Sequence, residues 1–392
     1  MSNLANAHLQ SDQDVAPLLL AAQVLRTDNE ALEAARSLAA NAREHAGKRD
    51  LQRKLPWSLV EEFTRSGLGS LSIAREFGGP QVSFVTLAEV FAIISAADPA
   101  LGQIPQNQVG ILSLIAATAT PAQKEHLFAS VLQGWRIGNA GPERGSKNTL
   151  ELKARITADG DDFVINGQKF YSTGALFAHW IAVKALDDNG KQVMAFVRRG
   201  TPGLRVVDDW SGFGQRTTAS GTVLLNNVRV EAELVVDSSR LNDAPNIQGA
   251  VSQLIQAAID LGIARGAIAD AISFVRERSR PWIDAKVERN SDDPYVIADI
   301  GKLNIELHAA EALLRKAGRV LDEVSAAPID AAGAARASIA VAEAKVLSTE
   351  LSLLASEKLF ELAGSRASLA EFNLDRHWRN ARVHTLHDPV RW

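Results

Sequence analysis

The chain has 392 residues, 46% of them hydrophobic and 22% charged, a composition typical of globular proteins that excludes collagen-like, disordered and disulfide-rich classes. Because it has no cysteine, it cannot contain a structural disulfide, a thiolate nucleophile or a cysteine-ligated metal site. Its 42 basic and 46 acidic residues give a net charge of −4 without a long basic block, which disfavours nucleic acid and anionic membranes as partners and favours a small-molecule ligand.

The first part of the sequence, residues 1–134, predicts a helical domain. Thr27 or Asp28 can cap a first helix, and Pro56 can begin a second. Ser83 can cap a third, and Pro121 occupies a typical first-turn position.

Residues 135–240 predict a β-domain. Asp-Gly or Asn-Gly pairs at residues 159–160, 166–167 and 189–190 separate short β-favouring runs, and such pairs favour hairpin turns because both residues adopt positive φ. Residues 150–156 alternate apolar and charged side chains, which is typical of a half-buried strand.

Residues 241–392 predict a helical bundle, since they are rich in alanine, leucine and glutamate and lack proline between Pro328 and Pro389. The fold class expected is therefore mainly α with an inserted β-domain. The longest apolar run, residues 250–272, is interrupted by polar side chains, and residues 15–25 lack the charged leader of a signal peptide. We expect a cytoplasmic protein without a membrane span.

Common nucleotide and hydrolase motifs are missing from the sequence. It contains no G-x-G-x-x-G after a strand, P-loop, H-E-x-x-H or G-x-S-x-G. A Rossmann dehydrogenase, a P-loop nucleotide triphosphatase, a zincin and an α/β-hydrolase are therefore disfavoured.

The histidines near the C-terminus are the first candidates for chemistry. His377, His384 and His387 stand close together among arginines, and imidazoles can perform acid–base work. The alternative is a solvated helix end, whose dipole favours cations. A metal site made by His384, His387 and Asp388 lacks a further ligand at the required spacing, so we expect no metal.

Three further segments are candidates for ligand binding. Tyr171, Ser172 and Thr173 offer a stacking face and hydroxyl groups, although a plain strand is the alternative. Residues 138–146 can line a ligand with backbone, or can be a flexible junction. Arginines at positions 276, 278, 280 and 366 can grip a phosphate, or form surface salt bridges.

The order of these parts and motifs resembles the acyl-CoA dehydrogenase superfamily over nearly the whole chain. Residues 169–174, 274–282 and 384–392 look like its flavin-dependent monooxygenase branch, which includes dibenzothiophene monooxygenase, sulfur-acquisition oxidoreductases and methanesulfinate monooxygenase. The His-x-x-His-Asp-Pro run is the most specific of the three. The resemblance implies N-terminal helices, a central β-barrel, a C-terminal helical bundle and a homotetramer.

The resemblance also implies cofactor-binding roles. Ser172 and Thr173 match a flavin-contacting segment, and Asn139 matches a flavin-site asparagine. Arg278 and Arg366 match arginines that hold the flavin phosphate, often across a subunit interface.

The implied activity is that of a two-component monooxygenase. A separate reductase supplies reduced FMN, which reacts with O₂ to a C4a-hydroperoxyflavin that oxygenates a small organosulfur compound in sulfur acquisition. His387, helped by His384 and Ser172, would be catalytic. Asn107 and Gln108 would bind a compact sulfinate or sulfone through their amides.

Two other functions stay open at this point. An FAD-dependent acyl-CoA dehydrogenase requires a glutamate base, but the corresponding residues 386–389 read Leu-His-Asp-Pro. A non-catalytic helical scaffold would carry the arginines and histidines as surface features. The resemblance further implies a short closing tail beyond Trp392, which this sequence does not contain.

Overall fold

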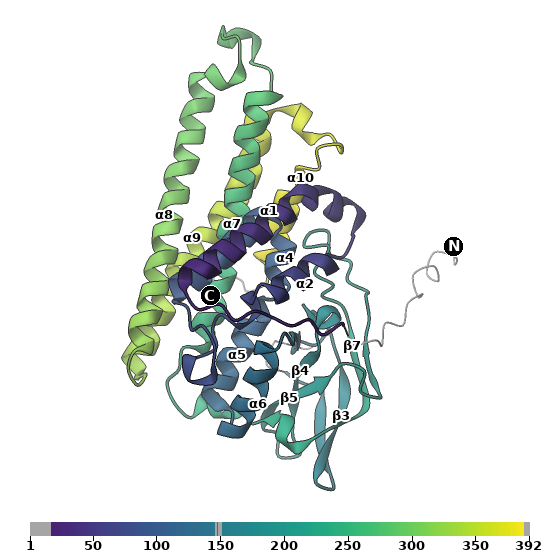
Figure 1. Cartoon of the computed structure of the whole chain (residues 1–392). Helices are drawn as coiled ribbons and strands as arrows, with labels where there is room; N and C mark the ends of the chain where they lie inside the picture. Colours follow the sequence, from purple (N-terminus) through teal and green to yellow (C-terminus); the bar gives the residue numbers. More distant parts are fainter. Residues whose placement is uncertain (1–16, 146, 148–150, 388–392) are drawn as a thin grey trace, which may run out of the picture.

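The computed structural model describes residues 17–145, 147 and 151–387, and its elements follow the predicted order. Figure 1 shows long helices on one side, strands at the lower right and N-terminal helices against both. The fold class, mainly α with an inserted β-domain, is thereby confirmed. The domain boundaries expected at residues 134 and 240 stay predictions.

The N-terminal helices begin at the residues that the sequence indicates. The Ser83 hydroxyl accepts a hydrogen bond from a first-turn amide, and Thr120 forms a capping box. The starts predicted near Thr27, Pro56, Ser83 and Pro121 are confirmed. The helices are α1 (Asp28–Gln52), α2 (Trp57–Arg65), α3 (Phe84–Ala97), α4 (Pro99–Gln103), α5 (Gln106–Thr118) and α6 (Pro121–Leu132).

The strands form a mostly antiparallel sheet in the order β6-β7-β3-β2-β4-β5-β8, with β1 paired in parallel to β4. This parallel pairing places the start of the β-domain beside a central strand. The strands are β1 (Ile137–Ala140), β2 (Arg155–Asp159), β3 (Asp162–Lys169), β4 (Trp180–Leu186), β5 (Gln192–Arg198), β6 (Leu204–Val206), β7 (Val223–Val230) and β8 (Val235–Val236).

Two of the three predicted hairpin turns are confirmed, and one is wrong. Gly160 and Gly190 adopt positive φ between the antiparallel pairs β2–β3 and β4–β5. Asp159 and Asn189 do not, so the expectation of positive φ at both residues of each pair is wrong. The pair at residues 166–167 instead lies inside β3, at a shift in its register with β7. A Cβ on Gly167 would lie 2.6 Å from the Cβ of Ala154, so this glycine permits close chain approach rather than a turn.

The strand expected from residue 150 begins only at Arg155. The burial pattern was predicted correctly, because Leu152, Ala154 and Ile156 are buried. The backbone N–H groups of Lys153 and Ala154 donate to the carboxylate of Glu143 instead of a neighbouring strand. Residues 148–150 lie outside the described part of the chain.

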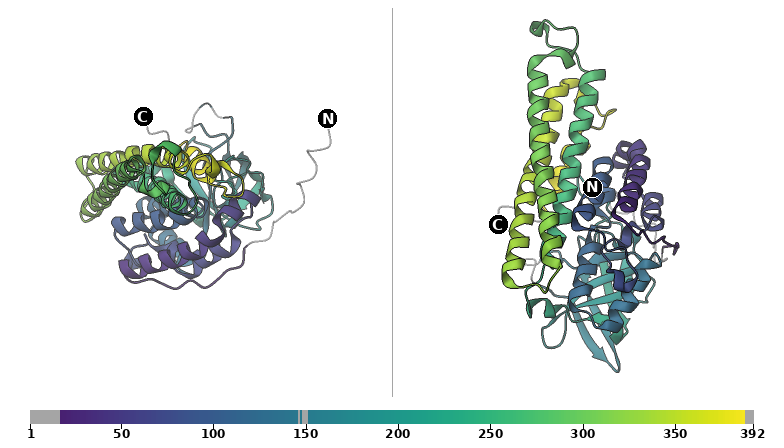
Figure 2. Two further views of the ribbon diagram at one scale, coloured as in Figure 1. Left: turned by 90° about the horizontal axis from the view of Figure 1, so that it is seen from above. Right: turned by 60° about the vertical axis from the view of Figure 1, so that its left-hand side comes forward.

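The C-terminal bundle consists of α7 (Gln248–Glu277), α8 (Pro294–Ser325), α9 (Ala331–Ala363) and the short α10 (Asp375–His384). Figure 2 shows α7, α8 and α9 running side by side along the length of the molecule. Small residues let α7 approach α3, since a Cβ on Gly262 would lie 2.6 Å from the carbonyl oxygen of Ala92. The helix α7 is therefore shared between the bundle and the N-terminal helices.

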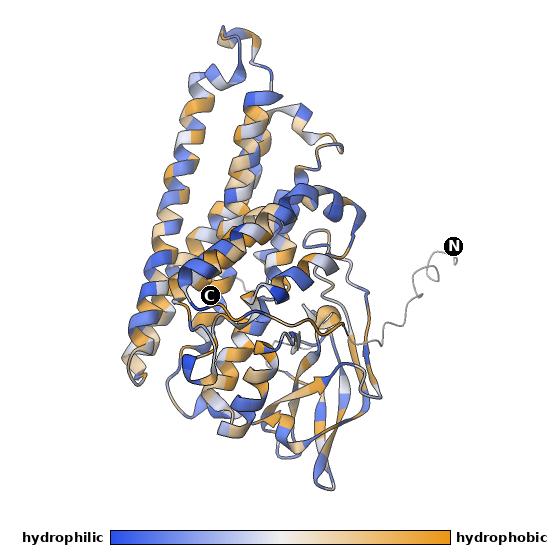
Figure 3. Cartoon of the chain, viewed as in Figure 1, coloured by the Kyte–Doolittle hydropathy of each residue, from blue (hydrophilic) through white to orange (hydrophobic). Residues whose placement is uncertain are grey.

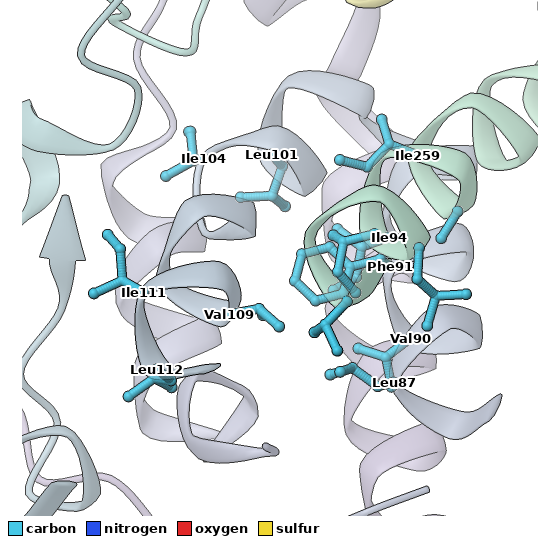
Figure 4. Close-up of a cluster of buried hydrophobic side chains, with 14 of the residues drawn as sticks. Leu87, Val90, Phe91, Ile94, Leu101, Ile104, Val109, Ile111, Leu112 and Ile259 are labelled. Carbon is cyan, nitrogen blue, oxygen red and sulfur yellow. The ribbon is translucent and has the colours of Figure 1, made fainter. Parts of the chain in front are cut away.

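A continuous hydrophobic core joins α3, α4, α5 and α7 (Figure 4). Burial of each such leucine, isoleucine or phenylalanine contributes about 1.5–3 kcal/mol. Labelled members are Leu87, Val90, Phe91, Ile94, Leu101, Ile104, Val109, Ile111, Leu112 and Ile259.

Ion pairs fasten α10 to the rest of the protein. On α7, Asp270 accepts from Arg376 Nη2 at 2.6 Å and pairs with His377 Nε2 at 2.8 Å. Arg379 Nη2 donates to Asp50 Oδ2, near the end of α1, at 2.6 Å. These contacts fix α10 between the first helix and the bundle.

Figure 3 shows hydrophilic residues recurring along the long helix α8. Over the described residues, none of the helices combines the length and the apolar character that crossing a membrane requires.

Candidate functional site

The segment after β3 is a loop that buries Ser172, so the alternative of a plain strand is wrong. The Ser172 N–H donates to the Gly221 carbonyl at 3.2 Å, and Tyr171 adopts a left-handed φ of 58°. The Ser172 hydroxyl is buried without a hydrogen-bond partner. In contrast, the Thr173 hydroxyl shares a 2.6 Å hydrogen bond with Ser220.

Asn139 lies on β1, next to this loop. Its backbone N–H donates to the Thr173 carbonyl at 3.1 Å, and its side-chain oxygen accepts from the Gly141 N–H. The neighbouring Gly138 permits this approach, since a Cβ there would lie 2.5 Å from the Cα of Ala175. The structure thus brings together Asn139, Ser172 and Thr173.

The turn between α4 and α5 lies against the same loop, because a Cβ on Gly174 would lie 2.8 Å from the carbonyl oxygen of Ile104. Asn107 places its amide nitrogen in the interior without a partner. The Gln108 side chain instead accepts from the Ile137 N–H at 2.8 Å and donates to the Gly69 carbonyl at 2.7 Å. These bonds join β1 to the helices, so Gln108 holds the wall of the site together.

The other wall is formed by α7, α9 and α10, where His384 is fully buried. Its Nδ1 lies 2.5 Å from Asp260 Oδ1, and the other carboxylate oxygen of Asp260 accepts from Lys345 Nζ at 2.6 Å and from Thr349 Oγ1 at 2.7 Å. The alternative of a solvated helix end is therefore wrong for His384. His387 is exposed, and its N–H donates to the His384 carbonyl at 3.0 Å.

Asp260 and His384 have shifted pKa values. Burial would raise the pKa of Asp260, but Lys345 and His384 outweigh it and hold this pKa well below its usual range. Burial lowers the pKa of His384. The combination favours a carboxylate that accepts the Nδ1–H of a neutral imidazole.

Two hydrogen bonds connect the walls. Gln256, one turn before Asp260 on α7, donates to Gln106 Oε1 at 2.9 Å. The Gln215 N–H donates at 2.7 Å to Asn380, one turn before His384 on α10. Residues four apart share one helix face, so the loop of Ser172, the α4–α5 turn and the His384 wall surround a common region.

Each of these segments carries buried polar side-chain atoms without partners. Native proteins leave few such atoms unpaired, and a concentration of them indicates an unseen ligand or water. We call the following residues, each with a buried partnerless side-chain atom, the central polar cluster: Gln103, Gln106, Asn107, Ser172, Gln215, Gln256 and His384.

Aromatic rings border the cluster at the surface. Tyr171 lies 6.1 Å from Trp210 between ring centroids, and Phe213 stacks on Trp378 at 6.0 Å. The Trp210 indole N–H donates to the Gln215 carbonyl at 2.9 Å, which ties the rings to the cluster.

The two predicted phosphate arginines lie together but far from the cluster. The guanidinium carbons of Arg278 and Arg366 lie 5.3 and 5.8 Å from the centroid of the Phe372 ring. In addition, Arg366 Nη1 donates to the Arg278 carbonyl at 3.4 Å. Arg278 lies about 27 Å along α7 from Asp260 at 1.5 Å per residue.

Several residues of the site were missed by the sequence reasoning. Asp260 carried a visible signal, because it is one of two carboxylates within the apolar helical run of residues 250–272. No signal in the sequence separates the other missed residues from ordinary surface residues; these are Lys345, Gln215 and Trp210. Among the described residues, no group of three metal-binding side chains is present, and Asp388 lies outside them.

Stability should fall at mildly acidic pH because three described histidines are buried with lowered pKa values. Burial and nearby Arg136 lower the pKa of His179 to about 4, and burial lowers those of His377 and His384. Unfolded histidine binds a proton below a pKa of about 6.5, so the unfolded state then gains protons that the folded state lacks.

We expect the free energy of unfolding to be constant above pH 7.5. Below pH 6.5 it should fall by up to about 1.4 kcal/mol per pH unit for each histidine. Urea denaturation at pH 8.0 and 5.5 measures this slope. The variant His377→Asn should reduce the slope, whereas replacing exposed His45 should not. Equal stability at both pH values would contradict the assignment.

Comparisons with known proteins agree with this architecture. Models of the acyl-CoA dehydrogenase N-terminal, middle and C-terminal domains match residues 27–135, 138–228 and 254–392. Dibenzothiophene monooxygenase of Rhodococcus erythropolis is 32% identical, over 93% of this chain and 91% of its own. A probable FMNH₂-dependent monooxygenase, SfnC, of Pseudomonas putida is 30% identical over 92% and 91%.

A solved structure shows the same likeness in three dimensions. Methanesulfinate monooxygenase MsuC of Pseudomonas fluorescens superposes with a TM-score of 0.84 at 29% identity, over 92% of this chain and 93% of its own.

Proposed function

Because the chain belongs to the acyl-CoA dehydrogenase family, in its branch of flavin-dependent monooxygenases, we propose that it is the oxygenase of a two-component system. It uses reduced FMN and O₂ to oxygenate a small organosulfur compound in sulfur acquisition. The observation that carries this proposal is the central polar cluster, whose partnerless atoms belong to the Ser172 loop, the α4–α5 turn, the His384 wall and the segments bonded to them.

The residues present fit a flavin. The Ser172 hydroxyl and the Asn139 side chain offer hydrogen-bonding groups to the edge of a planar ring, and Thr173 fixes their loop. When bound, reduced FMN supplies the two electrons with which one atom of O₂ is inserted into the substrate and the other leaves as water. The chain orients the flavin, excludes water and places proton donors.

The proton-handling groups are the two histidines at the end of α10. The neutral His384 presents its partnerless Nε2, and His387 follows on the exposed turn. We assign His387, helped by His384 and Ser172, to hydrogen-bonding the activated oxygen. His387 falls within residues 386–389, where the family resemblance implies the glutamate base of a dehydrogenase, so its presence favours oxygenation over acyl-CoA oxidation.

The substrate we infer is compact and polar. The amide of Asn107, with those of Gln103 and Gln106, presents buried partnerless atoms to the region. Amide groups can hydrogen-bond the oxygens of an alkanesulfinate or sulfone. Gln108 supports this wall through its two backbone hydrogen bonds.

We also propose a homotetramer. Arg278 and Arg366 lie at the other end of α7 from Asp260, the partner of His384, so we assign them to the phosphate of a flavin bound by a neighbouring copy. A separate cytoplasmic reductase would supply the reduced FMN, and we place the oxygenase in the same compartment. Light scattering coupled to gel filtration measures the oligomeric state.

Anaerobic titration with reduced FMN, followed by O₂ and a panel of methanesulfinate, dimethyl sulfone and dibenzothiophene, tests the function. We expect binding of reduced FMN and an oxygenated product from the small polar compounds. No binding would favour a helical scaffold, and reduction of bound FAD by an acyl-CoA would favour a dehydrogenase. Either result would overturn the proposal.

A further inference from the structure

The carboxylate of Asp260 has an unusual position in the fold. It is fully buried in α7 and lies between apolar neighbours on a helix that packs through small residues. Burying a charge costs several kcal/mol unless it is paired and hydrogen-bonded. Three donors, on His384, Lys345 and Thr349, meet this requirement.

The three donors are divided between the two oxygens of the Asp260 carboxylate. Lys345 neutralises the negative charge of Asp260 and shares one carboxylate oxygen with Thr349. The second oxygen faces His384 Nδ1. Because the charge is already balanced, His384 does not have to be protonated to complete the pair, and its proton resides on Nδ1.

The other nitrogen of His384 is therefore a lone-pair acceptor. Nε2 is buried and has no partner, and no second imidazole in the described part of the chain has such a nitrogen. A free acceptor inside a protein requires a donor to face it. His384 belongs to the central polar cluster, so we assign this donor to the bound ligand.

The reduced and oxidised states of a flavin differ in whether the N5 atom donates or accepts a hydrogen bond. The N5 atom of the reduced ring carries a hydrogen and donates, whereas N5 of the oxidised ring carries a lone pair and accepts. An acceptor nitrogen therefore discriminates between them, because two lone pairs facing each other leave both atoms without a hydrogen bond.

We propose that Asp260, with Lys345 and Thr349, is a positioning residue that keeps His384 Nε2 a hydrogen-bond acceptor and so makes the site prefer reduced over oxidised FMN. The inference rests on the proposed function. The preference lets the oxygenase take flavin from its reductase and release it after turnover.

The chain offers a matched control for this proposal. Asp270 lies on α7 ten residues after Asp260 and pairs with His377 and Arg376 of α10, as Asp260 pairs with His384 and Lys345. The variant Asp270→Asn removes a comparable carboxylate from the same pair of helices. The partners of Asp270 do not include His384 or Lys345.

The experiment measures dissociation constants of reduced and oxidised FMN by anaerobic and aerobic titration. The double variant Asp260→Asn/Lys345→Met removes both charges together. An asparagine can donate to His384 Nδ1 and thereby move the imidazole proton to Nε2, as happens when the aspartate of a catalytic triad is replaced. We expect the reduced-to-oxidised preference to fall about tenfold, the worth of roughly one hydrogen bond.

A second variant tests whether the loss of preference in the double variant results from misfolding. His384→Phe removes the acceptor, keeps a ring of similar size and leaves Asp260 with Lys345 and Thr349. It should show the same loss of preference, while Asp270→Asn keeps the preference of the parent protein. Thermal denaturation of each variant reports on its folding.

A readout without flavin completes the test. In protein labelled with ¹⁵N-histidine, the His384 signals, assigned by their loss in His384→Phe, should show a protonated Nδ1 and an unprotonated Nε2. The reverse tautomer, an unchanged preference in both variants, or an equal loss in Asp270→Asn would overturn the inference. A parent protein that binds no reduced FMN would instead overturn the proposed function.

Discussion

Alanine in place of His387 is expected to lower formation of the oxygenated product by about 10²–10⁴-fold, the usual contribution of a positioned acid–base group. Binding of reduced FMN should be largely unchanged, because the exposed His387 is not among the residues that we assign to holding the flavin. Product formation in the presence of a flavin reductase, with titration of reduced FMN, measures both quantities.

The consumed oxygen should then appear as hydrogen peroxide, since O₂ still meets reduced flavin but is not transferred to sulfur. The variant His45→Ala is a suitable control, because His45 is an exposed histidine on α1. Full product formation by His387→Ala would remove His387 from the catalytic role that we assign to it.

Methionine in place of Lys169 is expected to destabilise the protein by about 3–5 kcal/mol, the cost of leaving a buried charge unpaired. Lys169 is fully buried at the end of β3, where Nζ donates to Glu143 Oε1 at 2.7 Å and to the Gly141 carbonyl at 3.1 Å. The variant leaves the Glu143 carboxylate without its cation. Urea denaturation at neutral pH measures the loss.

The double variant Lys169→Met/Glu143→Gln should recover part of this stability, because the neutral amide no longer needs a counter-charge. Lys191→Met, an exposed change in the β4–β5 hairpin, should alter stability by less than about 0.5 kcal/mol. A loss below about 1 kcal/mol in the single variant would show that the pair is not the anchor of this segment.

The sequence predicted the features of the fold that depend on neighbouring residues. Caps such as Ser83 and Thr120 act within one helical turn, and the hairpin glycines Gly160 and Gly190 act within one turn between strands. The arrangement of helices around an inserted sheet followed from these local signals and from the family resemblance.

What the sequence did not predict depends on residues far apart in the chain. Gly167 resembles a hairpin glycine, yet the approach of Ala154 decides its use. Asp260 was interpreted only as an interruption of an apolar run, because its partners Lys345 and His384 lie 85 and 124 residues away. No local pattern pairs such residues.

The candidate site was predicted in part. Asn139, Ser172 and Thr173 do lie together, and Arg278 lies beside Arg366. The separation of these two groups depends on the length and direction of α7, which residue types alone do not give. Their roles in binding flavin stay predictions.

The bond between Arg379 and Asp50 joins residues 329 positions apart, so the end of the first helix acquires its partner only when the last helix has been made. At a synthesis rate of 5–20 residues per second, this interval is roughly 15 to 65 seconds. During translation, the N-terminal helices therefore stay incompletely packed until α10 has been synthesised. Apolar surface that is exposed in this interval favours aggregation, which chaperones prevent.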